Sequence, residues 1–137
     1  MFSKIMIPVD LGHTDKLNKA ISIAASLAKM DDAKVTVVGV TLSGPTAIAP
    51  NPEKFAEKLG AFAVECSDKY GVTFTAHSEV SHDPTIDLDG TLMGAANSIG
   101  ADLVVMASHV PGFAEYIFAS NAGYLASHSK MSVFVVR

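Results

Sequence analysis

Cysteine is almost missing from this sequence, since its 137 residues include only Cys66. A single cysteine forms no disulfide within the chain and provides no Cys-x-x-Cys pair for a zinc or redox site, so a reducing compartment fits best. Long apolar runs are missing too. The apolar stretch near the N-terminus ends at Pro8 and Asp10, and it is too short for a signal peptide or a membrane span. We expect a cytoplasmic protein with no membrane insertion.

Positive charge is also scarce. The sequence has 10 Lys and Arg against 14 Asp and Glu, a formal net charge of −4, and no Lys or Arg lies between Lys69 and Lys130. This balance disfavours broad adhesion to the phosphate backbone of nucleic acids or to anionic membranes. We therefore expect no nucleic-acid partner.

Apolar residues are the abundant class. They make up 49% of the sequence and charged residues 18%, which provides enough apolar material for a core and is unlike the composition of a disordered chain. The length falls within the usual range of one domain. We expect a single domain over residues 1–137.

Apolar periods of two and of 3.6 residues alternate along the chain, which predicts strands and helices in turn. Asn51-Pro52 and Asp83-Pro84 are typical helix starts, and glycine follows the second and third helices. Strands are predicted over residues 4–10, 34–40, 72–77, 102–107 and 132–136. Helices are predicted over residues 17–28, 52–70 and 84–99, and a short fourth helix is predicted to start at Ser120 or Asn121, after a long loop.

The strands differ in how they are covered. Residues 34–40 are β-branched at almost every position, which is typical of a parallel strand buried on both faces. Over residues 72–77 apolar and polar residues alternate, which places that strand nearer to an edge of the sheet. The last strand, over residues 132–136, is apolar at nearly every position, so its exposed edge would invite aggregation unless a two-fold partner covered it.

This alternation of strand and helix predicts an α/β fold. It is the order expected of a doubly wound, five-stranded parallel sheet with four helices and right-handed crossovers. Ligands of such sheets bind outside the carboxyl ends of the strands, where the winding reverses. The candidate site therefore comprises the loops over residues 8–12, 40–44 and 106–121.

Three stretches of the sequence point to a family. They are Ile7-Pro8-Val9-Asp10 at the end of the first strand, the fourth strand with Ser108-His109 behind it, and Ser120-Asn121-Ala122 ahead of a terminal Val-Phe-Val-Val-Arg. In these stretches, and in element order over essentially its whole length, the chain resembles the universal stress protein family. The resemblance implies a Rossmann-like, adenine nucleotide alpha hydrolase-like domain that binds adenine nucleotides in the stress response. It also implies a homodimer through residues 131–137 and no dedicated enzyme activity.

The resemblance also implies which residues meet the ligand, ATP accompanied by Mg²⁺. Pro8, Val9 and Asp10 would meet adenine and ribose, and Val40 would line the base. The residues implied beside the ribose and phosphates are Met106, Ala107, Ser108, His109, Val110, Ala119, Ser120 and Asn121. Bound Mg²⁺ and a positioned water would allow slow hydrolysis without a dedicated base.

Two alternatives stay open beside this reading. Nucleotide-binding relatives carry glycine where this chain has Ala107, Val110 and Ala119, so a nucleotide-free dimeric interaction protein is the alternative function. Asp10 could equally stabilise its own turn by accepting backbone N–H groups. Cys66 lies on the apolar stripe of the second helix, where a cysteine acts as a small hydrophobic residue.

Overall fold

Five parallel strands form one sheet, as the sequence predicted, and their order is β3-β2-β1-β4-β5. The computed structural model describes residues 1–108 and 115–137, with the backbone alone at 84, 85 and 115–120. The strands are β1 (Lys4–Pro8), β2 (Lys34–Leu42), β3 (Phe74–Ser81), β4 (Leu103–Ala107) and β5 (Ser132–Val136). The helices are α1 (Asn18–Asp31), α2 (Pro52–Tyr70), α3 (Pro84–Ile99) and α4 (Glu115–His128), with a 3₁₀ turn η1 (Thr14–Leu17) ahead of α1.

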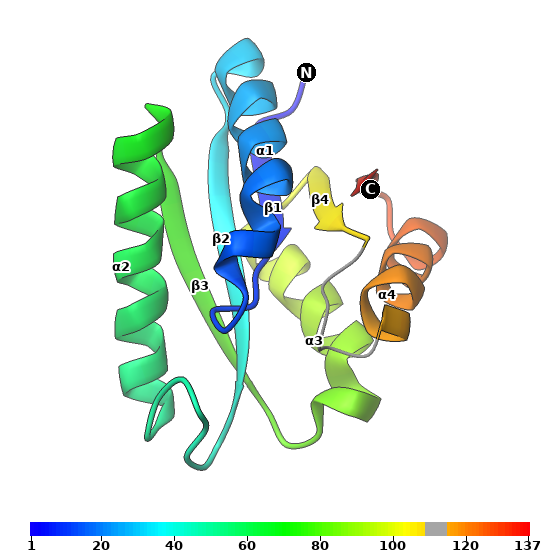
Figure 1. Cartoon of the computed structure of the whole chain (residues 1–137). Helices are drawn as coiled ribbons and strands as arrows, with labels where there is room; N and C mark the ends of the chain where they lie inside the picture. Colours follow the sequence, from blue (N-terminus) through cyan, green and yellow to red (C-terminus); the bar gives the residue numbers. More distant parts are fainter. Residues whose placement is uncertain (109–114) are drawn as a thin grey trace.

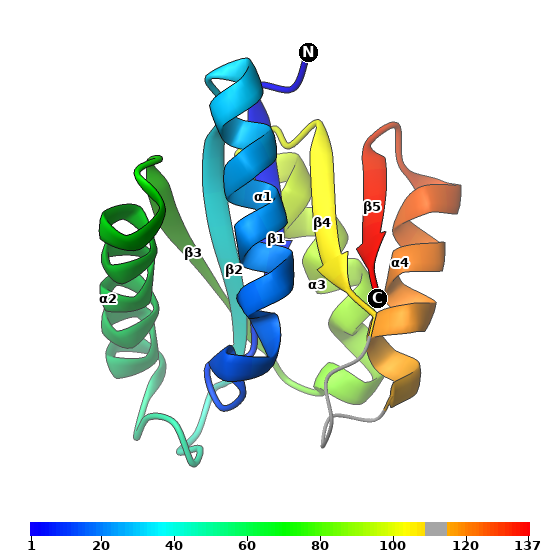
Figure 2. The same cartoon turned by 45° about the horizontal axis from the view of Figure 1, so that its top comes forward.

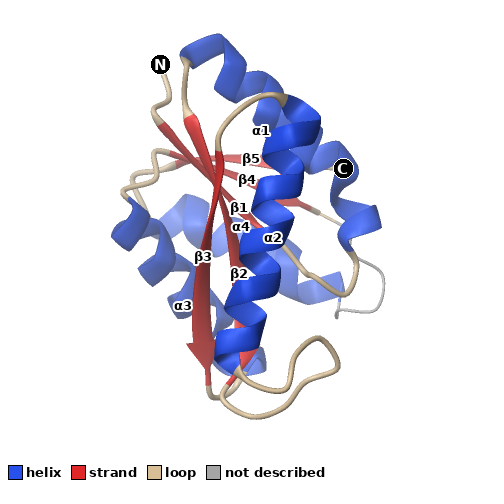
Figure 3. Cartoon of the chain, turned by 90° about the vertical axis from the view of Figure 1, so that its left-hand side faces the viewer, coloured by secondary structure: helices blue, strands red, loops and turns tan. Residues whose placement is uncertain are grey.

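Helices cover both faces of the sheet (Figure 1). Helices α1 and α2 lie on one face and α3 and α4 on the other, which is clearest when the sheet is seen from the side (Figure 3). The central strands are consequently buried on both faces, and every residue of β4 is buried. Figure 2 shows β1 in the middle, with the chain running outward to β3 in one direction and to β5 in the other. The winding therefore reverses beside β1, whose following loop is among those predicted for the site.

The predicted ends of α2 are confirmed. The side chain of Asn51 accepts a hydrogen bond of 2.9 Å from the backbone N–H of Lys54, and Pro52 occupies the first turn. At the other end Gly71 has φ of +70° and donates its N–H to the carbonyl of Ser67 at 3.0 Å. That left-handed conformation favours glycine, so the residue stops the helix as expected.

The predicted start of the fourth helix is wrong. Helix α4 begins at Glu115 rather than at Ser120 or Asn121, so both residues lie within the helix and neither caps it. The physical reason is in the sequence. Pro111 and Gly112 are the last strong helix breakers before Gly123, so residues 113–122 contain nothing that would prevent a helix. Residues 109–114 lie outside the part of the chain that the structure describes.

The two sheet edges are β3 and β5. Strand β3 pairs with β2 over eight residues and runs from Phe74 to Ser81, four residues beyond the predicted end, and its edge position agrees with the prediction. Strand β5 pairs with β4 and exposes Phe134 and Val135, at 42% and 43%. No helix in the described part of the chain is long and apolar enough to cross a membrane.

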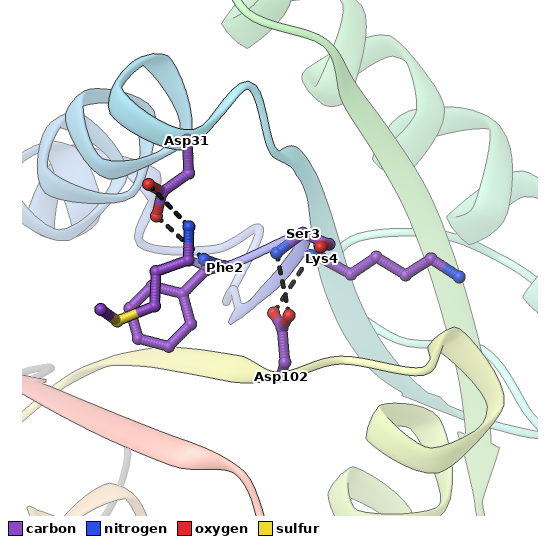
Figure 4. A network of polar contacts seen from close by, with 6 residues as sticks. Phe2, Ser3, Lys4, Asp31 and Asp102 are labelled. Carbon is purple, nitrogen blue, oxygen red and sulfur yellow. Dashed lines mark hydrogen bonds and ion pairs between the residues drawn. The ribbon is translucent and has the colours of Figure 1, made fainter.

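Two aspartates hold the N-terminal residues onto the sheet (Figure 4). The carboxylate of Asp102 accepts the backbone N–H groups of Ser3 at 2.8 Å and Lys4 at 3.1 Å. The carboxylate of Asp31 accepts the N–H of Phe2 at 2.9 Å and pairs with the α-ammonium of Met1 at 2.9 Å. These contacts fasten the start of β1 to the end of α1 and to the start of β4.

Candidate functional site

A pocket of about 330 Å³ opens at the carboxyl ends of β1 and β2. Its walls come from the loop after β1, the end of β2, the loop after β2, and helices α2 and α3. Most of the lining side chains are apolar. The described lining residues are Pro8, Val9, Asp10, Leu11, Gly12, His13, Val38, Val40, Thr41, Leu42, Thr46, Ala47, Ile48, Phe55, Leu88 and Leu92.

The loop between β2 and α2 forms one rim of this pocket. Its shape comes from Thr46, whose hydroxyl oxygen accepts the N–H groups of Ile48 and Ala49 at 3.2 Å each. The N–H of Thr46 in turn donates to the carbonyl of Ala49 at 2.8 Å. From α2, the ammonium of Lys58 donates to the carbonyl of Ile48. The rim is thus a closed turn fastened to a helix.

Helices close the pocket from both faces of the sheet. The ring of Phe55 in α2 packs against Gly39, where a Cβ atom would lie 2.8 Å from its Cζ. Gly39 is therefore what leaves room for the ring beside β2. Leu88 and Leu92 of α3 approach from the other face and are buried.

The turn after β1 places an acid and a histidine side by side. Oδ1 of Asp10 accepts the N–H of Gly12 at 2.8 Å, and Oδ2 lies 2.9 Å from Nδ1 of His13. The N–H of His13 also donates to the carbonyl of Asp10 at 3.0 Å. Asp10 therefore does stabilise its own turn, one of the two roles the sequence left open, and it does so inside the pocket lining.

The described lining includes no Lys or Arg. Its titratable groups are Asp10 and His13, with side chains 15% and 39% exposed. An apolar cavity with one carboxylate in its lining suits a ligand in which a flat ring is joined to a group that carries hydroxyls. The sequence between Lys69 and Lys130 adds no permanent cation.

Four of the predicted site residues meet in this pocket: Pro8, Val9, Asp10 and Val40. The described lining does not include Met106, Ala107 or Ser108, of which the first two are buried at the end of β4. His109 and Val110 lie outside the described residues, as do the side chains of Ala119 and Ser120. Asn121 is 2% exposed in α4, and its Nδ2 has no hydrogen-bond partner.

Eight residues of the described lining lie outside the loops that the sequence predicted for the site: His13, Val38, Thr46, Ala47, Ile48, Phe55, Leu88 and Leu92. Phe55, Leu88 and Leu92 were correctly predicted to lie on the apolar faces of their helices. Apolar periodicity, however, does not show which residues of such a face border a cavity. The loop residues carried a weaker signal. A threonine such as Thr46 often stabilises a turn by accepting the backbone N–H of the residue two positions further on, here Ile48.

A second hollow lies along β5. It is lined by Ser108, Ala122, Gly123, Ala126, Val133, Val135 and Arg137. The small residues come from α4 and the valines from β5. This groove borders the exposed strand edge and not the first pocket.

Neither a metal site nor a reactive thiol stands out in the described part of the chain. No group of three or more His, Cys, Asp or Glu side chains there could hold a metal ion. Burial raises the pKa of the Cys66 thiol to about 11, with the nearby charge of Glu65 adding to the effect. A thiol with so high a pKa is a poor nucleophile, as expected of a residue on the apolar stripe of α2.

The chain is similar to proteins of one family. A model described as the universal stress protein family matches residues 1–137. Universal stress protein G of Shigella flexneri is 28% identical over 150 residues, covering 100% of each chain. A solved universal stress protein in complex with cAMP has a TM-score of 0.69 at 19% identity, over 99% of this chain and 97% of that one. The universal stress protein of Archaeoglobus fulgidus in complex with dAMP has a TM-score of 0.68 at 20% identity, over 98% of each chain.

Proposed function

Because this chain belongs to the universal stress protein family, we propose that it binds adenine nucleotides as a cytoplasmic regulatory module of the stress response. The observation that supports this proposal is the pocket at the carboxyl ends of β1 and β2, the edge where doubly wound sheets bind their ligands. The relatives solved with cAMP and with dAMP hold ligands that share an adenine ring. Binding is the main activity proposed, because the described lining offers no nucleophile with an adjacent base.

In this proposal the base and the ribose occupy different parts of the pocket. Val9, Val40, Ile48 and Phe55 provide apolar contacts for the two faces of adenine. The carboxylate of Asp10 accepts from the ribose hydroxyls, because an ionised carboxylate has about four lone-pair positions and the turn uses only two.

The phosphates are proposed to lie toward β4 and α4. The residues proposed beside them are Met106, Ala107, Ser108, His109, Val110, Ala119, Ser120 and Asn121. The unpartnered Nδ2 of Asn121 supports this placement, because a buried amide nitrogen without an acceptor is rare in folded proteins. Residues 70–129 contain no Lys or Arg that could neutralise the phosphates, so ATP would bind together with Mg²⁺. We also propose that ATP is hydrolysed slowly by a water that the bound Mg²⁺ would position.

Calorimetric titration tests the proposal directly. Adenosine, AMP and ATP with Mg²⁺ should give saturable heats and GTP should give none. Val40→Phe fills the pocket and should weaken adenosine binding by about tenfold or more. Val64→Phe makes the same change on an exposed face of α2 and should leave binding unchanged.

No heat with any adenine ligand, after removal of co-purified nucleotide, would overturn the binding proposal. The nucleotide-free dimeric interaction protein would then be the better account, with the alanines at positions 107 and 119 as its reason.

We propose a homodimer through residues 131–137 in either case. The exposed side chains of Phe134 and Val135 and the free edge of β5 support it, because an uncovered apolar edge strand is prone to aggregate. Val135→Lys should give a monomer by light scattering. Val80→Lys places the same charge on the opposite edge strand, where Val80 is 48% exposed, and should leave the mass unchanged. A dimer that survives Val135→Lys would contradict this interface.

A further inference from the structure

The turn over residues 10–13 leaves Asp10 with both carboxylate oxygens already engaged. Gly12 donates to Oδ1 at 2.8 Å, and His13 lies 2.9 Å from Oδ2. A Cβ atom at position 12 would stand 3.2 Å from Oδ1 and 3.6 Å from Cδ1 of Ile48, so the turn fits closely between the acid and the rim loop. His13 is therefore held beside Asp10 by the shape of its own turn.

This geometry assigns the two nitrogens of the His13 ring. An ionised carboxylate can only accept hydrogen bonds, so Nδ1 of His13 carries a hydrogen and donates it to Asp10. The second nitrogen, Nε2, is then the one that can gain or lose a proton. With Nε2 unprotonated the pair carries one negative charge, and with Nε2 protonated it carries none.

We propose that His13 sets the charge preference of this pocket: its protonated form admits an anionic nucleotide, and its neutral form favours an uncharged nucleoside. The inference rests on the proposed adenine-nucleotide function and concerns the regulation of that same site. Its physical basis is that His13 is the one group in the described lining that can become positive. It also adjoins the one acid there, whose negative charge disfavours an anionic ligand relative to an uncharged one in a site partly removed from water.

The other charged groups near this turn do not replace His13. Asp15 and Lys16 follow it on the exposed side of η1 and are absent from the described lining. Lys58, from α2, uses its ammonium on the carbonyl of Ile48. Strand β2 and helix α3 contribute only uncharged side chains to the described lining.

The test compares two ligands that differ from each other in charge. The charge of each ligand stays the same over the pH range that is used. Adenosine is neutral, and the phosphodiester of cAMP keeps a single negative charge across the range in which histidine titrates. AMP is less suitable, since its phosphate loses a second proton near pH 6. Affinities for adenosine and cAMP are measured by calorimetry at several values between about pH 5.5 and 8.

Two substitutions fix the charge at position 13. His13→Gln is permanently neutral and still offers an N–H to Asp10, and His13→Lys is permanently positive. The matched control is His77→Gln, because Nε2 of His77 lies 2.7 Å from Oε1 of Glu79 in a similar pair on β3, outside the described lining. Thermal unfolding checks that each variant is folded.

The expected result is that cAMP binds about five- to tenfold more tightly at the acid end than at the alkaline end, with adenosine nearly unchanged. His13→Gln should bind cAMP weakly and His13→Lys tightly, both without pH dependence, and His77→Gln should behave as the parent protein does. Equal pH responses for both ligands, or a pH response of cAMP binding that persists in His13→Gln, would overturn the inference and leave nucleotide binding intact. Absence of binding by either ligand at every pH would overturn the proposed function and this inference with it.

Discussion

Gly39 is the residue through which β2 and α2 come together. A Cβ atom there would lie 2.8 Å from Cζ of Phe55 and 3.1 Å from Cδ2 of Leu59. Side-chain carbons are not found so close to one another, so any larger residue must displace the ring. The pocket and the core share this contact, because Phe55 belongs to both.

We predict that Gly39→Ala lowers the free energy of unfolding by about 1–3 kcal/mol, because it overpacks a buried contact. Urea unfolding measures the change. Adding Phe55→Leu should recover part of the loss, so the two substitutions should be non-additive. Gly94→Ala, on an open helix surface, is the control and should stabilise the protein slightly. A loss at Gly94 as large as that at Gly39 would point to a cause other than the ring contact.

Asp31 carries a pH-dependent contribution to stability. The N–H of Phe2 and the α-ammonium of Met1 hold the pKa of this carboxyl below its usual value of 3.8. The folded-state pKa is thus lower than the unfolded one, so the contribution is complete above the unfolded value and is lost as the pH falls through the folded value. We predict that Asp31→Asn destabilises the protein at pH 7 and that this difference shrinks under acid conditions. Chemical unfolding at several pH values measures it, and a pH-independent difference would contradict the assignment.

At the scale of elements, Asp102 connects the first strand to the fourth. Its carboxylate accepts from Ser3 and Lys4, its N–H donates to the carbonyl of Lys4 at 3.0 Å, and its own carbonyl accepts from Ser132 at 3.1 Å. One residue thus links the starts of β1, β4 and β5. Such a junction sets where the three strands begin relative to one another.

We predict that Asp102→Asn costs about 1–2 kcal/mol of unfolding free energy, because an amide nitrogen replaces an oxygen that accepts a backbone N–H. Asp68→Asn on the exposed face of α2 is the matched control and should change stability by less than about 0.5 kcal/mol. Urea denaturation of the two variants gives the comparison. Equal effects would mean that net charge, and not this junction, decides the outcome.

Most elements could be predicted from the sequence, because their signals are local. Caps such as Asn51 and stops such as Gly71 act within a few residues, and both ends of α2 were confirmed. The early start of α4 could not be read in the same way, since Glu115 carries no cap signal of its own. Strand β3 extends beyond its alternating segment because eight residues pair with β2, and such a register is a property of two segments together.

The site was predictable only where it follows a strand. Val9, Asp10 and Val40 lie in loops that were predicted because the ends of parallel strands meet at one edge, and the family resemblance singled them out within those loops. Ile48 and Leu92 join them from a loop and a helix that lie far apart in sequence, so only the folded chain shows their common cavity. The pairing of His13 with Asp10 also depends on a turn geometry that composition does not reveal.

At the scale of the whole molecule, ligand binding and stability are linked. A ligand that binds only the folded chain at about 100 times its Kd stabilises it by about 2.7 kcal/mol. For a domain of this size we predict that adenosine raises Tm by several degrees. Circular dichroism is the suitable readout, because the chain has no Trp. A Tm that stays constant while calorimetry reports saturation would contradict binding to the folded pocket, and Val40→Phe should make the shift smaller at the same adenosine concentration.

Because β1 lies in the centre of the sheet, its two neighbouring strands are synthesised on the ribosome at different times. One of its partners, β2, is complete at Leu42, whereas the other, β4, is complete only at Ala107. At translation rates of about 5–20 residues per second, roughly 3–13 s separate the two events. Throughout that interval one edge of β1, four of whose five residues are buried in the finished sheet, has no partner strand. The emerging polypeptide therefore exposes a strand edge that the finished sheet covers.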